Sequence, residues 1–595
     1  MAEEVVKKAL KGGEFLIRET KAQEVFIPEE FSEEAHMIAQ TCYGFIKEEV
    51  IPKIQQIDAL EEGLMPSLIQ KSGDLGLLGA SVPEDLGGMN VNFPISLLIA
   101  EAMGGAYSFS VAFTAHTGIG TLPILYYGNE AQKKKYIPKL ASGEWKSAYC
   151  LTEPSSGSDA NSGKTKAVLS ADGKHYILNG QKMWITNAGF ADIFTVFAKI
   201  DDDQNLSAFI VEKDYPGITL NAEEKKMGIK GSSTRQVFFN EVKVPVENLL
   251  STRGNGFKIA LNILNIGRIK LGAGVLGGAK DAIRLSIKYA LEREQFGRPI
   301  AKYGAIKTKI GEQVIKSYIL ESAVYRAGQN IDDAIASYVS EGKPEAEAIL
   351  KGIEQFAPEC ALLKVLGSEV LDFVVDEGVQ IHGGMGFSAE SMIERAYRDS
   401  RINRIFEGTN EINRMLLVEM VLKRAMKGEL DLMTPAMAVG KELMAVPNMG
   451  ATVSNDLEKY RVYIASFKKA ILLVAGAAVQ KLMNTLQKEQ EVLMHIADMC
   501  IQLYGIESTF LRLEKLQQMG KNVDNVWAVL KVGTEEAAQI IASKGREAIA
   551  HFAQADEAKM MLIGLNRFTK TDAVDVIALK RQIADISLAK GGYTV

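Results

Sequence analysis

One glutamate has a sequence setting that suits a general base. Glu407 lies in the stretch FEGTNEINR (residues 406–414), between a phenylalanine and a glycine. A carboxylate in an apolar pocket has a raised pKa, which brings it towards the range where a base works near neutral pH. A single glutamate of this kind is more often a solvated loop residue, so the string alone leaves both interpretations open.

Two further segments could bind a flat, polar ring. The stretch CLTEPSSGSDA (150–160) is rich in small hydroxyl residues and glycine, which let backbone amides approach an anion or a ring edge closely. In KMWITN (182–187), Trp184 and Thr186 would share one face of a strand, so an indole could cover a ring while a hydroxyl bonds its edge. The alternatives are an ordinary polar turn and a core tryptophan.

Nucleotide-binding loops and metal sites are not indicated. QIHGGMG (380–386) does not follow a strand and lacks the Lys-Ser/Thr of a Walker-type loop, so by itself it is consistent with a helix C-cap. The six histidines form no ligand cluster, and we expect no catalytic metal.

Composition narrows the class of protein. The 595 residues suggest three to four domains, and the net charge of -6 argues against nucleic acid as a partner. The four cysteines lie far apart, which indicates a reducing compartment. We see no signal peptide or clear transit peptide and no apolar run long enough to span a membrane, so we expect a cytoplasmic protein. Peripheral membrane contact stays open.

The chemical segments are embedded in an ordered series of elements. Helical periodicity predicts an N-terminal helical domain (1–145), and β-branched and aromatic runs separated by turn residues predict a compact antiparallel β domain (146–250). Long helices then predict an antiparallel bundle (251–425), followed by a Pro- and Gly-containing linker (426–456) and a C-terminal helical extension (457–595).

Seven stretches, in this order and spacing, resemble the acyl-CoA dehydrogenase family, especially its very-long-chain branch and the respiratory assembly relative of that branch. They are VPEDLGGMN (82–90), LTEPSSGSDA (151–160), KMWITNAG (182–189), KMGIKGSSTRQVFF (226–239), YALEREQFGRPI (289–300), QIHGGMGF (380–387) and RIFEGTNEINR (404–414). The resemblance implies a mainly α fold with a middle β domain and a C-terminal four-helix bundle, with the additional C-terminal helical domain as the feature of that branch.

The resemblance also implies FAD, lying between the β domain and the bundle. Its implied contacts fall in three groups: Tyr149, Leu151, Thr152, Ser158, Trp184 and Thr186 around the ring and pyrophosphate; Arg293, Gln295, Phe296, Gln380, Gly383 and Gly384 reaching the FAD of a neighbouring subunit; and Thr409 and Glu411 after the base. Ser158, Asn265, Arg268 and Gly408 are implied substrate contacts.

By the same resemblance, Glu407 removes the α-proton of an acyl-CoA while flavin N5 takes the β-hydride, giving a trans-2-enoyl-CoA in fatty-acid β-oxidation. Some members carry the base on a bundle helix beside the arginine matched by Arg268, but the residue there is Gly267, which leaves Glu407. Electron-transfer flavoprotein is the implied electron acceptor.

The length of the acyl chain and the oligomeric state are predicted from positions where this sequence differs from other members of the family. Val111 and Ala115 match positions where two polar side chains close the acyl pocket of medium-chain relatives, so we expect a deep pocket for long chains. The extension favours a homodimer, with a tetramer as the alternative. The linker stretch 431–456 has one lysine and no arginine, which predicts weak or absent membrane attachment. An acyl-CoA oxidase and a scaffold that keeps only the fold are the competing functions.

Overall fold

The computed structural model describes residues 10–444 and 455–595. Helix-capping residues and glycines mark the ends of helices before the sheet. In α7 (Glu130–Ser142), Asn129 accepts from the Gln132 N–H at the start, and Gly143, with φ +79°, ends the helix. These helices are α1 (Glu33–Phe45), α2 (Ile54–Asp58), α3 (Leu64–Asp74), α4 (Phe93–Met103), α5 (Ser108–Thr114), α6 (Leu122–Tyr127) and α7 (Glu130–Ser142).

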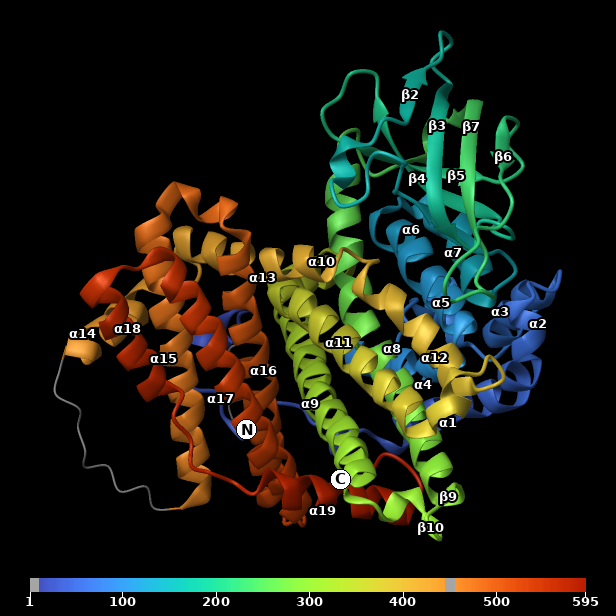
Figure 1. The fold of residues 1–595 in the computed structure, drawn as a ribbon. Helices are drawn as coiled ribbons and strands as arrows, with labels where there is room; N and C mark the ends of the chain where they lie inside the picture. Colours follow the sequence, from blue (N-terminus) through green and yellow to red (C-terminus); the bar gives the residue numbers. More distant parts are fainter. Residues whose placement is uncertain (1–9, 445–454) are drawn as a thin grey trace, which may run out of the picture.

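The strands of the large sheet form the part that stands above the helices in Figure 1. They are β1 (Ser147–Cys150), β2 (Lys166–Leu169), β3 (His175–Thr186), β4 (Ile193–Ile200), β5 (Ser207–Glu212), β6 (Ile218–Leu220), β7 (Thr234–Pro245) and β8 (Leu249–Leu250). The predicted β segments are confirmed, but a purely antiparallel sheet was wrong: β1 and β2 both pair in parallel with β4. Each of these pairings joins strands that are distant in sequence, and periodicity within one strand carries no information about its partner's direction.

Long helices resume after the sheet and form the bundle. They are α8 (Gly256–Glu292), α9 (Gly304–Ser340), α10 (Glu345–Gln355), α11 (Ala357–His382), α12 (Met392–Ser400) and α13 (Asn410–Met426), with a short hairpin of β9 (Glu294–Gln295) and β10 (Arg298–Pro299) after α8. Pro358 lies in the first turn of α11, where its missing N–H costs no hydrogen bond.

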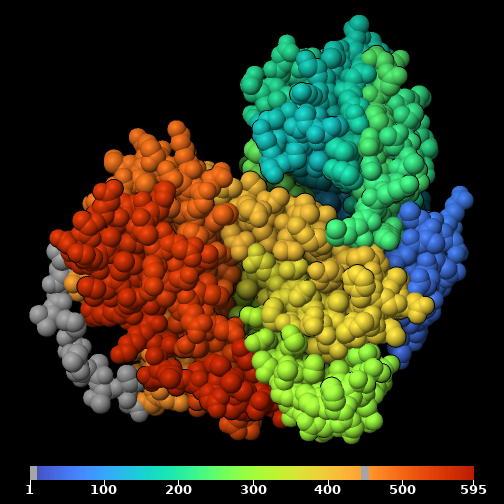
Figure 2. All heavy atoms as spheres, viewed as in Figure 1, coloured from blue at the N-terminus to red at the C-terminus, as the bar shows by residue number. Residues whose placement is uncertain are grey.

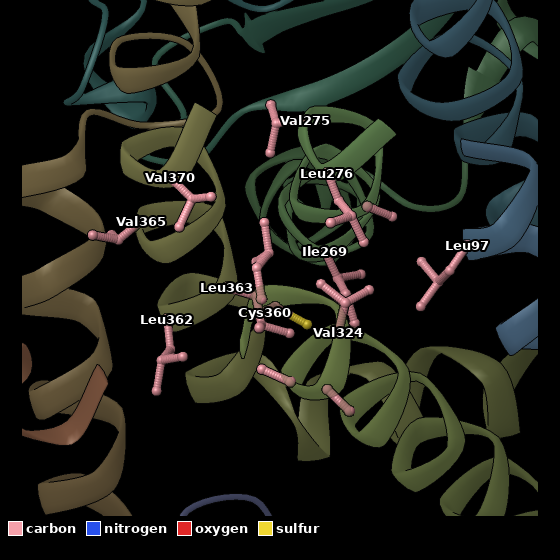
Figure 3. Close-up of a cluster of buried hydrophobic side chains, with 14 of the residues drawn as sticks. Leu97, Ile269, Val275, Leu276, Val324, Cys360, Leu362, Leu363, Val365 and Val370 are labelled. Atoms are coloured by element: carbon pink, nitrogen blue, oxygen red, sulfur yellow. The ribbon is translucent and has the colours of Figure 1, made fainter. Parts of the chain in front are cut away.

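The centre of the molecule is a dry core between the bundle and the N-terminal helices. Figure 3 shows Leu97 of α4 facing Ile269 and Leu276 of α8, with Val324 of α9 and Leu363 of α11 packed beside them. All five side chains are fully buried. Burying a side chain of this size stabilises the folded state by roughly 1.5–3 kcal/mol, so these contacts hold α8 between α4, α9 and α11.

The extension packs on the outer face of the bundle. It comprises α14 (Met433–Met444), α15 (Asp456–Leu482), α16 (Gln490–Gln518), α17 (Asp524–Phe552), α18 (Ala555–Phe568) and α19 (Val576–Lys590). Arg414 of α13 pairs with Asp498 of α16 at 2.7 Å, and Lys316 of α9 pairs with Glu536 of α17 at 3.0 Å. In Figure 2 the extension and the bundle form one continuous surface, whereas a recess separates the sheet from the helices beneath it.

One feature of this region differs from expectation, and one was not anticipated. The stretch predicted as a linker contains the helix α14. Its Pro435 does not prevent the helix, because it falls in the first turn, where proline is tolerated. Residues 445–454 lie outside the described part. The beginning of the chain packs on the extension: Glu29 pairs with Arg512 at 2.7 Å, and Glu30 pairs with Lys515 at 2.6 Å.

Two helices are long and apolar enough to cross a membrane by length and composition. They are Gly256–Glu292 and the continuous helical stretch Asp456–Lys488, and 67% and 50% of their most apolar windows are buried inside the protein. This burial is the pattern of core helices in a folded domain.

Candidate active site

Glu407 lies in a tight turn between a short helical turn (Arg401–Arg404) and α13. Its φ is +59° and that of Gly408 is +83°, a conformation that non-glycine residues rarely adopt and that persists where surrounding contacts enforce it. Those contacts are on the Glu407 carbonyl, which accepts from Arg268 Nε at 3.2 Å and from Asn413 Nδ2 at 3.4 Å. Thr409 caps α13 by accepting from the Ile412 N–H at 3.3 Å.

This turn aims the Glu407 side chain at α8. Gly267 has no side chain there, and a Cβ at that position would lie 2.6 Å from Glu407 Oε2. The carboxylate therefore occupies space that only glycine leaves open. The sequence predicted Gly267 as the reason why the base must be Glu407, and the two residues do face each other.

The surroundings of the carboxylate are those of a base. Burial raises the pKa of Glu407 to about 7, against the opposing effect of the Arg268 guanidinium and the Lys364 ammonium. Glu407 Oε2 has no hydrogen-bond partner among the described residues, and the Glu407 N–H likewise donates to no described residue. The site thus presents a proton acceptor and a free amide donor from the same residue.

Glu407 lines a cavity of about 180 Å³. One wall is a face of α8 on which Gly267, Leu271, Gly274 and Gly278 follow each other at three- and four-residue spacing. The opposite wall consists of Tyr107, Ser110, Val111, Thr114 and Ala115 of the α5 region and Gly104 and Gly105 before it. Its apolar, elongated shape suits an alkyl chain.

The predicted flavin contacts lie beside this cavity to different degrees. Thr186 lines it, and Tyr149 is buried with an unpartnered hydroxyl. Leu151 and Thr152 follow β1 and lie against β3: the Leu151 carbonyl accepts from Lys182 Nζ at 3.1 Å, and the Thr152 carbonyl accepts from the Met183 N–H at 3.0 Å. Ser158 is exposed in the loop between β1 and β2 and does not line the cavity.

Trp184 does not follow the regular alternation that the sequence argument used. The register of β3 on β7 shifts between Lys182 and Ile185, and Trp184 has φ +60°, so Trp184 and Thr186 are not simple same-face neighbours. This irregularity leaves the indole 54% exposed, an unusual state for a tryptophan in a sheet.

The remaining predicted residues form two groups. Asn265 and Arg268 are buried on α8, bonded to each other at 2.8 Å, while Glu411 is exposed in the first turn of α13. Arg293, Gln295 and Phe296 and Gln380, Gly383 and Gly384 are exposed where α8 and α11 end. The Tyr289 ring stacks on His382 at 4.3 Å, which brings these two segments to the same end of the bundle. The end of α8 lies about 38 Å along the helix from Gly267.

Sequence reasoning missed two lysines at the site. Lys364 of α11 donates to Asn410 Oδ1 at 2.8 Å and lowers the pKa of Glu407, and Lys270 of α8 lines the cavity itself. A lone lysine within the apolar run ALLKVLG (361–367) is a signal that could have pointed to Lys364.

Comparisons with known proteins agree with the geometry. Family models match in order: acyl-CoA dehydrogenase N-terminal domain (residues 32–144), middle domain (148–242) and C-terminal domain (254–422), with a further model described as acyl-CoA dehydrogenase, C-terminal domain, at 466–567. A probable acyl-CoA dehydrogenase of Bacillus subtilis is 46% identical over 98% of both chains.

A relative and a solved structure extend this result. The human mitochondrial very long-chain specific acyl-CoA dehydrogenase is 41% identical over 68% of this chain and 58% of its own length. The crystal structure of an acyl-CoA dehydrogenase complexed with FAD from Bacillus anthracis has a TM-score of 0.96 and 47% identity, covering 99% of this chain and all of that one. The chain belongs to the acyl-CoA dehydrogenase family.

Proposed function

We propose that the protein is an FAD-dependent acyl-CoA dehydrogenase that converts long-chain acyl-CoA into trans-2-enoyl-CoA in fatty-acid β-oxidation. The observation that carries this proposal is the Glu407 carboxylate, whose pKa is raised to about 7, at the inner wall of an elongated cavity along α8. A carboxylate in water is too weak a base for the α-proton of a thioester, and burial is the physical means of strengthening it.

The residues present fit the cofactor that the family implies. The indole of Trp184 is 54% exposed although it lies in a sheet. Tyr149 has a buried hydroxyl without a partner, and Thr186 lies at the cavity wall. A large flat ring bound against this end of β3 would cover the indole. The chemistry that FAD supplies when bound is acceptance of the β-hydride of the substrate.

The protein's own groups would do the rest. The Glu407 N–H is free to donate to the thioester carbonyl and so stabilise the negative charge that develops as the α-proton leaves, an effect typically worth a few kcal/mol. Glu407 Oε2, which has no competing donor, receives that proton. The electrons of the broken Cα–H bond form the double bond as the hydride leaves the β-carbon.

The cavity wall supports a preference for long chains. From Gly267 to Asp281, the α8 residues that line it span about 21 Å at 1.5 Å per residue. An extended chain of roughly 16 carbons has a similar length, at about 1.3 Å per carbon from C–C bonds near 1.5 Å. Val111 and Ala115 line the opposite wall, from which bulkier side chains would close the cavity.

The closing residues give a test of chain length. Exchanging Val111→Gln together with Ala115→Glu should lower kcat/KM for long acyl-CoAs by roughly 100-fold, because the added atoms fill the channel, while short chains keep their rate. Steady-state kinetics over a length series measures this. Val339→Gln, on the exposed side of α9, is the control; an unchanged length profile in the double variant would remove Val111 and Ala115 from the pocket.

The activity itself is tested by anaerobic titration of the purified, FAD-loaded protein with saturated acyl-CoAs of graded length. We expect one class of lengths to bleach the flavin absorbance band stoichiometrically. A protein that binds no FAD even after reconstitution would defeat the proposal, as would a flavoprotein that no acyl-CoA reduces, which is the outcome expected of a scaffold.

We propose electron-transfer flavoprotein as the acceptor, a cytoplasmic location and a homodimer. The extension supports the dimer because α16 covers the bundle face formed by α9 and α13, where further subunits could otherwise pack. Rapid peroxide formation in air without an acceptor protein would favour the competing acyl-CoA oxidase. Mass measurement in solution distinguishes the dimer from the tetramer.

A further inference from the structure

Lys270 is a cation on the wall of the acyl cavity. It lies on α8, one turn after Gly267, and lines both the cavity that contains Glu407 and a second, much smaller cavity of about 20 Å³. The smaller cavity lies between α4, the α5 region and residues 77–82, and its size admits about one water molecule. Lys270 is half-buried.

No described residue forms a hydrogen bond or an ion pair with Lys270. Burial alone accounts for its pKa, which is lowered to about 8, so the side chain is still mostly protonated at neutral pH. Among the other buried lysines of the described chain, Lys182 pairs with Glu153 at 2.7 Å and Lys280 with Glu101 at 2.6 Å. Lys364 donates only to the neutral amide oxygen of Asn410, at 2.8 Å. Lys270 differs from all three because no described residue bonds to it, which is rare for a lysine away from solvent.

None of the acids that line the same cavity pairs with Lys270. Asp281 accepts from Arg284 at 2.6 Å and from the Tyr107 hydroxyl at 3.3 Å. Asp399 accepts from the Ile229 N–H through one oxygen, and its other oxygen has no partner among the described residues. Glu407 faces Gly267 and is needed as the base. A charge with which no described residue forms an ion pair, on the wall of a substrate cavity, is available to the substrate.

The hydroxyls near Lys270 do not supply the missing counter-charge. Ser96, Thr114 and Thr117 line the smaller cavity and donate to backbone carbonyls of their own helices, at 2.7, 2.7 and 3.0 Å. Their lone pairs, or a water beside them, can solvate an ammonium but leave its charge in place. A plain alkyl chain that filled the main cavity would remove further water from Lys270 and give nothing in exchange.

We propose that Lys270 is a specificity-determining residue that pairs with a carboxylate carried by the acyl chain, so that the preferred substrates are CoA monothioesters of dicarboxylic acids. This inference rests on the proposed function and refines its substrate class. Lys270 lies three helical positions after Gly267, a rise of about 4.5 Å, to which the lysine side chain adds its own reach. The carboxylate would therefore lie several carbons beyond the thioester, at a length the experiment can identify.

The test uses the FAD-loaded enzyme and two matched series, saturated acyl-CoAs and ω-carboxyacyl-CoAs of the same lengths. In the wild type we expect one ω-carboxyacyl length to exceed its plain counterpart in kcat/KM by at least 10-fold. Lys270→Met keeps the alkyl stem and removes the charge. It should lower kcat/KM for that ω-carboxy substrate by about 100-fold, mainly through KM, because it leaves a buried carboxylate unpaired.

Several outcomes separate this inference from the function on which it rests. Lys316→Met, on α9 and paired with Glu536 outside the cavity, should change neither series. A wild type that favours plain chains at every length overturns the proposal, as does an unchanged preference in Lys270→Met; either result would assign the ammonium to solvation in the smaller cavity. If neither series bleaches the flavin, the dehydrogenase proposal itself fails.

Discussion

Replacing Glu407 by glutamine should slow reduction of the flavin by acyl-CoA by about 10⁴-fold, the upper range for loss of a general base. Glutamine keeps the size of the side chain and the backbone N–H that would bind the thioester carbonyl, so acyl-CoA binding should change only a few-fold. Anaerobic stopped-flow absorbance gives the rate, and the spectral shift on adding an unreactive acyl-CoA analogue gives the binding constant.

A second buried carboxyl provides the matched control. Burial also raises the pKa of Glu359 to about 7, but it lies on α11 outside the cavity, where it accepts from the Gly13 N–H at 2.7 Å. Glu359→Gln should reduce flavin at the wild-type rate. If both variants lose activity equally, or Glu407→Gln keeps it, Glu407 is not the base.

Protein stability gives the same substitution an independent readout. Because folding raises the pKa of Glu407 from 4.5 to about 7, the folded state holds a proton that the unfolded state releases between these values. The contribution of the neutral carboxyl is fully present below pH 4.5 and is lost as the pH rises through 7. Glu407→Gln should therefore be more stable than the wild type above pH 7, by up to about 3 kcal/mol, with little difference at pH 4.

Gly267→Ala is expected to lower the rate of flavin reduction by roughly 100-fold. The new methyl carbon would lie 2.6 Å from Glu407 Oε2, so the carboxylate must move by about 1 Å, and a shift of that size can cost a factor of 10² in a positioned reaction. Single-turnover kinetics measures the effect. Gly44→Ala, on α1 with nothing near the added carbon, controls for the helical substitution. A fully active Gly267→Ala would show that the carboxylate does not need this space.

The parts of the fold that the sequence predicted are those that depend on local pattern. Helical spacing located α8 and α11, and β-branched runs located β3, β4, β5 and β7. The parallel pairing of β1 and β2 with β4 was not predictable, because it depends on which distant strand lies alongside. The same holds for Glu29 and Glu30, whose partners lie in α16, nearly five hundred residues later.

The candidate active site likewise has parts that the sequence predicted and parts that it did not. Glu407 and Gly267 could be paired from the sequence because the family pattern contains both alternatives for the base. The irregularity at Trp184 could not be predicted from the sequence. It arises from a shift in the register of β3 on β7, and there successive side chains no longer alternate between the two faces of the strand. Lys270 carries no motif: its significance comes from the lack of a partner in three dimensions, which no one-dimensional pattern records.

The packing of the first residues on the extension has a consequence for biosynthesis. Glu29 is separated from Arg512 by 483 positions, and ribosomes add about 5–20 residues per second. Roughly 25 to 100 s therefore pass between the emergence of the two partners. During that interval the N-terminal segment leaves the ribosome without its binding surface, and apolar side chains such as Phe15 and Ile27 stay open to solvent or to chaperones. The C-terminal extension thus completes the folding of residues 10–30.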